Sequence, residues 1–213
     1  MEEKEITPIE TKEEKSEEVK LVPNGGYPMH TFEEIKEAYY LYIKDEDDRA
    51  MIEKAYALVK KQHAGIYRKS GEPYIHHLLE VAYTITQLQG GPVTIAAGLL
   101  HDVVEDTDTT IEDIERMFGP ECAKIVDALT KIQRLKLSHR TQEEFEAEDR
   151  RKIFLGMAKD VRVIIIKLAD RLHNMRTIAA LKPERQMALA RETFDVFAPI
   201  AHRLGIYRIE SEL

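Results

Sequence analysis

Hydrophobic residues recur at helical spacing along most of the chain from Thr31 onward. Thr31 followed three residues later by Glu34 is a capping-box pattern, which predicts that a first helix begins there. The spacing predicts two more helices, from about 47 to 65 and from about 74 to 89, with a polar, glycine-containing loop at 66–73 between them. No alternating pattern typical of a strand accompanies these helices.

The next segment, from Val93 to about Val104, is apolar nearly all round, which is typical of a central, buried helix. A cap at Thr109 or Thr110 predicts a further helix, and Gly119-Pro120 separates it from another at 121–131.

Residues 133–150 are highly polar, and we interpret them as a mobile loop that enters a helix from about Thr141 and that could gate a pocket. Asp160 then caps 161–172, a β-branched run that is also compatible with a strand. We favour a helix because Leu168 and Leu172 continue the same apolar face. Further helices follow from Pro183 and within 198–213, so the pattern predicts an all-α bundle of about ten helices.

The N-terminal segment departs from this pattern. Residues 1–20 contain eight Glu and four Lys but few aliphatic side chains, so they cannot bury enough apolar surface to offset the entropy of ordering. We therefore expect three regions: a disordered acidic tail and loop at 1–28, a helical domain at 29–197, and the start of a helical linker at 198–213. The simplest interpretation of the tail is a solvated segment without function.

Composition narrows the function classes. The 213 residues include 31 Lys and Arg against 39 Asp and Glu, and this net charge of −8 argues against binding to nucleic-acid polymers. The single cysteine, Cys122, excludes an intrachain disulfide framework and a thiolate zinc cage. The longest aliphatic run, 163–166, is too short to span a membrane, and the N-terminus lacks a secretory signal pattern, so we expect a cytoplasmic location.

The strongest chemical signal is His101-Asp102 at the end of the apolar helix. Burying two ionisable side chains costs several kcal/mol unless something compensates, and a divalent cation bound by imidazole and carboxylate would do so. One pair cannot hold an ion alone; His77 (or its neighbour His76) and Asp170 are further candidates, each flanked by apolar residues. Each of these residues taken singly is equally compatible with an ordinary salt-bridged pair.

Two more groups accompany this pattern. Glu105 lies one helical turn after His101, so Glu105 and Asp106 are candidates to orient water or transfer protons; the residues alone do not assign their separate roles, and a solvated helix end is the alternative. Residues 68–71 form a short cationic loop, which alone would be a common surface loop but beside a metal site would bind a purine face or a phosphate.

The ordered set His77, His101-Asp102 and Asp170 resembles the HD phosphohydrolase superfamily. Four longer strings are similar to the hydrolase domain of the RelA/SpoT (Rel) family, and the likeness covers roughly residues 45–213. These strings are 68–75 (RKSGEPYI), 101–107 (HDVVEDT), 167–177 (KLADRLHNMRT) and 198–206 (APIAHRLGI).

This resemblance implies an all-α HD-domain helical bundle that binds Mn²⁺ and hydrolyses the 3′-pyrophosphate of the alarmone (p)ppGpp, giving GDP or GTP plus pyrophosphate in the stringent response. Three sets of residues match positions with known roles in the family. They are the metal ligands His77, His101, Asp102 and Asp170, the catalytic pair Glu105 and Asp106, and the nucleotide-pocket residues Arg68, Lys69, Ser70, Tyr74, Asn174 and Thr177.

Two departures from the family pattern are visible: Leu78 stands where the family usually has proline after the ligand histidine, and the chain stops at Leu213, where bifunctional members continue into a synthetase domain. We therefore expect part of a longer enzyme, with contacts to a C-terminal synthetase domain. The competing hypotheses are an HD phosphohydrolase acting on another nucleotide, and a regulatory nucleotide-binding module that is inactive in this fragment.

Overall fold

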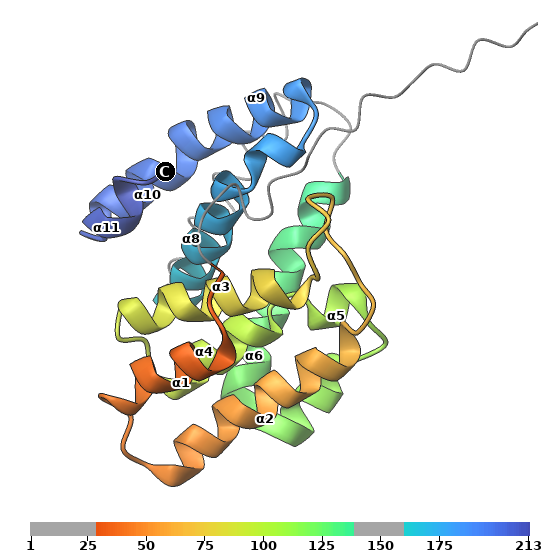
Figure 1. Cartoon of the computed structure of the whole chain (residues 1–213), viewed down its shortest axis with the longest axis vertical. Coiled ribbons are helices and arrows are strands. Elements are labelled where there is room, and N and C mark those ends of the chain that lie inside the picture. The colour runs from red at the N-terminus through yellow and green to blue at the C-terminus, as the bar shows by residue number, and fades with distance from the viewer. Residues whose placement is uncertain (1–28, 139–159) are drawn as a thin grey trace, which may run out of the picture.

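The computed structural model describes residues 29–138 and 160–213 of the chain. Over these residues it is helical and contains no strand, only an isolated bridge between Tyr67 and Pro73, so the all-α prediction is confirmed (Figure 1). The α-helices are α1 (Phe32–Tyr40), α2 (Glu46–Gln62), α3 (Ile75–Gln87), α4 (Pro92–Leu100), α5 (Val103–Asp106), α6 (Ile111–Ser138), α8 (Val161–Arg176), α9 (Pro183–Glu192), α10 (Ala198–Arg203) and α11 (Tyr207–Glu210). In the described ranges, none of these helices has the length and apolarity that crossing a membrane requires.

The centre of the fold is α4, which packs against α2, α3, α6 and α8. Its residues from Thr94 to Leu100 are all buried, as the apolar pattern predicts. Gly98 allows α3 to approach closely, because a Cβ added there would lie 2.4 Å from the Cδ1 atom of Ile85. The close contact between α3 and α4 brings their polar residues within reach of one another.

Local signals account for several helix ends. The Thr31 hydroxyl accepts a hydrogen bond from the Glu34 amide while Glu34 accepts one from the Thr31 amide, so the predicted capping box forms at the start of α1. The Asp160 carboxylate accepts a hydrogen bond of 3.0 Å from the Arg162 amide at the start of α8. The β-branched run that follows is helical rather than a strand.

Two predicted boundaries were wrong. The single helix expected over 93–104 is broken at His101 and Asp102, which lie between α4 and α5. Residues 133–138, expected to begin a loop, are helical instead, because α6 continues to Ser138. α6 is kinked at Gly119, whose φ of 84° is not helical. The predicted tail at 1–28, the helix from about Thr141 and the gating segment beyond 138 lie outside the described residues.

The C-terminal elements form a second layer on α8, on the side away from α1 and α2 (Figure 1). A turn of π-helix at Thr193–Phe197 joins α9 directly to α10. A separate apolar cluster links this layer to α8. Its buried members are Ile164, Leu168, Leu172, Val196, Phe197, Ile200, Ala201 and Ile209. As a result, α8 packs on the main core with one face and on the C-terminal layer with another.

Candidate active site

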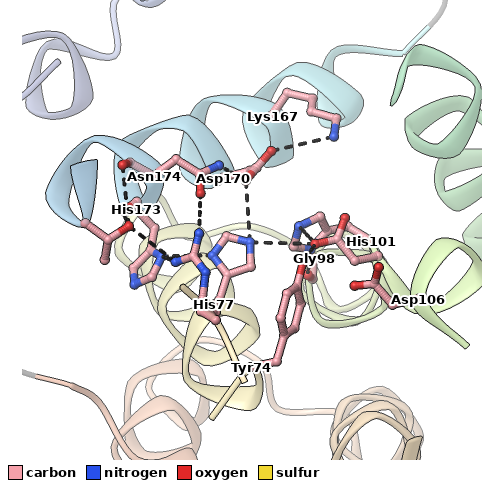
Figure 2. A network of polar contacts seen from close by, with 12 residues as sticks. Tyr74, His77, Gly98, His101, Asp106, Lys167, Asp170, His173 and Asn174 are labelled. Atoms are coloured by element: carbon pink, nitrogen blue, oxygen red, sulfur yellow. Dashed lines mark hydrogen bonds and ion pairs between the residues drawn. The ribbon is translucent and has the colours of Figure 1, made fainter. Parts of the chain in front are cut away.

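Three segments that are distant in the sequence converge on one buried cluster of histidines and aspartates. His77 comes from α3, His101 and Asp102 from the junction of α4 and α5, and Asp170 from α8 (Figure 2). His77 Nε2 lies 3.4 Å from Asp170 Oδ1 and 3.7 Å from Asp102 Oδ2. His76, the alternative ligand on sequence grounds, is outside this cluster.

The break between α4 and α5 explains how neighbouring residues reach the same point. Side chains that follow one another on a continuous helix diverge by about 100°. Asp102 instead has a φ of −107° and a ψ of −4°, outside regular helix geometry. His101 Nε2 lies 3.0 Å from Asp102 Oδ2 as a result.

The hydrogen bonds of His101 define which ring nitrogen is free. Its Nδ1 lies 2.8 Å from the Gly98 carbonyl oxygen, which only accepts, so Nδ1 carries the proton and donates. Its buried Nε2 has no hydrogen-bond partner despite its closeness to Asp102. Burial disfavours the charged imidazole, but attraction to Asp102 outweighs it and raises the pKa of His101. This environment favours positive charge at Nε2, whether from a proton or from a metal ion.

The protonation of His77 Nδ1 follows from its contact with His173. Arg68 Nη1 lies 2.8 Å from His173 Nδ1, and a guanidinium only donates, so His173 Nδ1 must accept. His77 Nδ1 lies 2.8 Å from the same atom and therefore also donates. Burial lowers the pKa of His77, which remains neutral with an unprotonated Nε2 directed at the two aspartates.

Both aspartates are held in their ionised form. Burial alone would raise the pKa of Asp170, yet Lys167 and the neighbouring imidazoles hold it well below its usual value. His101 has the same effect on the pKa of Asp102. Asp170 Oδ1 accepts a hydrogen bond of 2.6 Å from Asn174, and Asp102 Oδ2 accepts one of 2.6 Å from the Tyr74 hydroxyl.

This donor set is suited to a divalent cation. One ligand atom each from His77, His101 and Asp170 lies within 4.8 Å of the others. In both histidines Nδ1 is engaged in a hydrogen bond, which leaves Nε2 to face the cluster. Asp102 lies against both histidines but is turned toward the Tyr74 hydroxyl. Nitrogen and carboxylate oxygen together are ligands that suit manganese, zinc and related ions.

A cavity of about 360 Å³ adjoins the cluster. It is lined by all six residues expected in the nucleotide pocket, Arg68, Lys69, Ser70, Tyr74, Asn174 and Thr177, together with Tyr67, Ala180, Leu181 and Leu189. Two of the lining residues, Tyr74 and Asn174, are the donors to Asp102 and Asp170. The same two side chains therefore line the cavity and bind the aspartates of the histidine–aspartate cluster.

Arg68 is fixed in this wall by residues of one helix. Its guanidinium donates to Asn174 Oδ1 at 2.5 Å and to Thr177 Oγ1 at 3.3 Å, in addition to His173. These partners, two on α8 and one at its C-terminal cap, hold the guanidinium plane in one orientation, and Glu72 lies 3.6 Å from it. Arg68 is thus a rigid planar cation at the cavity, which suits stacking on an aromatic base.

Glu105 and Asp106 both lie on α5. Figure 2 shows Asp106 on the other side of the His77–His101 pair from Asn174. Together with Gln62, Thr107 and Asp108, Glu105 and Asp106 line an acidic recess of about 400 Å³. Burial, followed by repulsion from Asp102, raises the pKa of Glu105 to about 7, and the same two causes raise the pKa of Asp106. A carboxyl group with a pKa of about 7, such as Glu105, can transfer protons near neutral pH.

Sequence reasoning missed two buried histidines beside this site. His173 follows Asp170 by three residues, a spacing that places both on one face of a helix, and this was the available signal. His63, at the end of α2, gave no signal because nothing in its neighbourhood differs from an ordinary helix end. Its ring stacks on that of Tyr74 with centroids 5.2 Å apart.

Comparison with known proteins places these residues in a wider context. A family model of the HD domain matches residues 55–207. The guanosine-3′,5′-bis(diphosphate) 3′-pyrophosphohydrolase of Spiroplasma citri is 47% identical over 182 residues, which cover 85% of this chain and 24% of that protein. The bifunctional (p)ppGpp synthase/hydrolase SpoT of Escherichia coli is 42% identical over 185 residues, covering 87% and 26%.

A solved structure is also similar. It belongs to a metazoan ortholog of SpoT, described as hydrolysing ppGpp and acting in starvation responses. It is 30% identical, with a TM-score of 0.53, and the match covers 68% of this chain and 84% of that one. The chain spans about a quarter of the length of the curated relatives that it matches.

Proposed function

Because the chain belongs to the HD-domain family, and within it to the SpoT/Rel group, we propose that it hydrolyses (p)ppGpp. The reaction removes the 3′-pyrophosphate and yields GDP or GTP plus pyrophosphate, as a step in alarmone turnover during the stringent response. The names of the relatives support this substrate. One observation carries the proposal: two residues that line the cavity, Tyr74 and Asn174, also donate hydrogen bonds to Asp102 and Asp170 of the histidine–aspartate cluster.

The cofactor that we propose is Mn²⁺, held by His77, His101, Asp102 and Asp170. The unpartnered Nε2 of His101, the position of His77 Nε2 against Asp170 and Asp102, and the two ionised carboxylates support this assignment. When bound, a divalent ion supplies positive charge opposite the phosphate oxygens and lowers the pKa of water.

We propose that the purine lies in the cavity against the fixed Arg68 guanidinium, with the sugar directed toward Tyr74 and Asn174. Lys69 and Ser70 are available to the 5′ phosphates, and the buried Ser70 hydroxyl has no hydrogen-bond partner in the described structure. A nucleotide placed this way brings its 3′ phosphates to the ligand cluster. Positioning of this kind converts attack by water into an effectively intramolecular step.

The chemistry requires two proton transfers, which we assign to the two carboxyl groups on α5. The oxygen of water forms a bond to the phosphorus attached to the ribose, and the bond from that phosphorus to the 3′ oxygen breaks. Asp106 accepts the proton that the water loses. Glu105, whose pKa is raised to about 7, donates a proton to the 3′ oxygen as it leaves.

We also propose contacts to a synthetase domain where this domain is part of a bifunctional protein, as the name of the Escherichia coli relative describes for that protein. The C-terminal layer leaves three large apolar side chains exposed: Met187, Phe194 and Tyr207. Exposed apolar groups of this size favour burial against another surface.

The test is pyrophosphate release from ppGpp by metal-loaded protein, compared with protein freed of metal by a chelator. We expect turnover that depends on Mn²⁺ and is lost in Asp170→Asn. The exposed carboxylate Glu37 on α1 provides the matched control, and Glu37→Gln should retain full activity.

A panel of deoxynucleoside triphosphates and cyclic dinucleotides separates the alternatives. Faster turnover of one of these would favour an HD phosphohydrolase with another substrate. Binding of ppGpp without any turnover by intact, metal-loaded protein would favour the regulatory module and reject the proposed reaction.

A further inference from the structure

A second cavity lies where α3, α8 and α11 meet. Its volume is about 180 Å³, which is enough for a small organic molecule rather than for one or two waters. Among the described residues that line it, none lines the nucleotide cavity or belongs to the histidine–aspartate cluster. Helices α3 and α8, which carry His77 and Asp170, therefore each border two separate sites.

One part of the wall of this second cavity is apolar. Leu172 and Ile209 belong to the buried cluster that links α8 to the C-terminal layer, and Leu88 packs against that cluster. The rings of His30 and Tyr83, stacked with their centroids 3.5 Å apart, line the cavity as well. A ligand with an apolar body would therefore gain free energy by leaving water here.

The segment that precedes α1 is fixed as part of the wall. The His30 amide donates to Glu80 Oε1 at 2.6 Å, and His30 Nδ1 lies 2.9 Å from the same oxygen. The Glu80 side chain is buried on α3, so this contact ties the segment to the helix. A wall that is already in place reduces the ordering cost of binding.

The polar part of the wall carries net positive charge, because Arg176 and Arg208 line it together with one carboxylate, Glu212. Arg176 donates to Glu212 Oε2 from Nε at 3.1 Å and from Nη2 at 2.5 Å. Arg208 Nη1 donates to the Gln87 amide oxygen at 3.1 Å. An amide oxygen has no formal charge, so this contact does not neutralise Arg208.

The pair of Arg176 and Glu212 shows which chemical group the polar end accepts. Two donors of one guanidinium converge on a carboxylate oxygen, which is a strong, charge-assisted contact. The Glu212 side chain is 32% exposed, so it can turn into solvent at small cost. A carboxylate from a ligand could then take its place and would have Arg208 as a second cationic partner.

We propose that this cavity binds a small carboxylic acid with an apolar body. The carboxylate replaces Glu212 against Arg176 and is shared with Arg208, while the apolar body lies on Leu172 and Ile209. The bound acid fixes α11 against α3 and α8. This site is separate from the proposed hydrolysis of ppGpp, so each can be accepted or rejected without the other.

The first test is calorimetry of the Mg²⁺-loaded protein with phenylacetate as the probe. We expect a Kd of about 1 mM or tighter. The neutral analogue phenylacetamide and inorganic phosphate should each bind at least about tenfold more weakly, because the first lacks the charge and the second lacks the apolar body. Equal affinity for either of them would overturn the proposal.

Substitutions test the polar end in two directions. Arg208→Gln removes a cation but keeps a polar side chain, and we expect it to weaken phenylacetate binding about tenfold. Glu212→Gln removes the competing carboxylate and should strengthen binding about threefold or more. The matched control is Arg185→Gln on the exposed side of α9, which should leave the affinity unchanged. Unchanged binding in Arg208→Gln, or weaker binding in Glu212→Gln, would reject the assignment.

Methyl resonances locate the bound acid without any substitution. The phenyl ring shifts the resonances of methyl groups that it touches, so the Ile209 methyl signals of the Mg²⁺-loaded protein should move with the same Kd as calorimetry gives. Ile52, which is buried in the main core on α2, provides the internal reference and should not move. An Ile209 signal that stays in place at saturating phenylacetate would put the acid elsewhere and overturn the proposal.

Discussion

The Nδ1 atoms of His77 and His173 lie 2.8 Å apart, and the Arg68 guanidinium donates to the same nitrogen of His173. Two donors thus converge on one lone pair. Burial, together with the positive charge of Arg68, lowers the pKa of His173 far below its usual value, so the ring remains a neutral acceptor. Through this acceptor, a residue of the cavity wall determines which nitrogen of His77 is free to bind a metal.

Replacing His173 should therefore weaken metal binding. In His173→Asn the amide oxygen can take the place of Nδ1 as an acceptor, whereas His173→Leu fills the space without one. We expect His173→Leu to lower Mn²⁺ affinity by about 10- to 100-fold and His173→Asn to lower it much less. Titration of the metal into both variants, followed by calorimetry, provides the measurement. Equal affinities in the two variants would contradict a role in setting the His77 tautomer.

Metal binding should also stabilise the fold, because the ligands come from three separate segments. At a free Mn²⁺ concentration of about 100 times Kd, the gain in unfolding free energy is about 2.7 kcal/mol. We expect thermal unfolding to show this gain in the wild type and in Glu37→Gln, and to show none in Asp170→Asn. A rise in the melting temperature of Asp170→Asn equal to that of the wild type would place the ion elsewhere.

Much of this site could be predicted from the sequence because its polar residues stand within otherwise apolar helices. His101 and Asp102 interrupt an apolar helix, and Asp170 does the same in α8, so both departures are visible in the pattern. The fold class followed from periodicity in the same way. The assignment of Arg68, Asn174 and Thr177 to one pocket came instead from the family resemblance, since residues about 105 positions apart carry no local sign of contact.

Glu105 predicts a pH dependence of stability in the metal-free protein. Its pKa rises from the ordinary 4.5 to about 7 in the folded state, chiefly through burial. A raised carboxyl pKa means that folded protein binds the proton more tightly than unfolded protein, so this group's contribution to stability is lost as the pH rises from 4.5 to 7.

We therefore expect the free energy of unfolding of Glu105→Gln, minus that of the wild type, to be larger at pH 8 than at pH 5. Urea unfolding of both proteins without metal provides the measurement. Saturating Mn²⁺ should reduce this difference, because a nearby cation favours the carboxylate. A stability difference that is the same at both pH values would mean that Glu105 titrates normally.

Arg68→Lys tests whether shape or charge matters at the cavity. Lysine keeps the positive charge but lacks the planar fork that reaches Asn174 and His173 together. We expect KM for ppGpp to rise by about tenfold or more, with a smaller loss of Mn²⁺ affinity. An unchanged KM would indicate that only the charge is used and would argue against stacking of the base.

Other features could not be predicted, for physical reasons. The break at His101 and Asp102 depends on tertiary packing, because the local apolar pattern favours a continuous helix. The helical course of residues 133–138 also contradicts their polar composition, because α6 continues there from a well-packed segment. The partners of His63 and His173 depend on which long-range contacts form, and neighbouring residues do not encode that choice.

The placement of Asp170, Asn174 and Thr177 along α8 has a mechanical consequence. Asp170 and Asn174 lie on one face of the helix and Thr177 caps its C-terminal end, while other faces of the same helix pack on the core and on the C-terminal layer. A small rotation or slide of α8, driven from the C-terminal side, would displace the ion ligand and the nucleotide contacts in one movement. A change in the position of this helix would therefore alter metal binding and nucleotide binding together rather than separately.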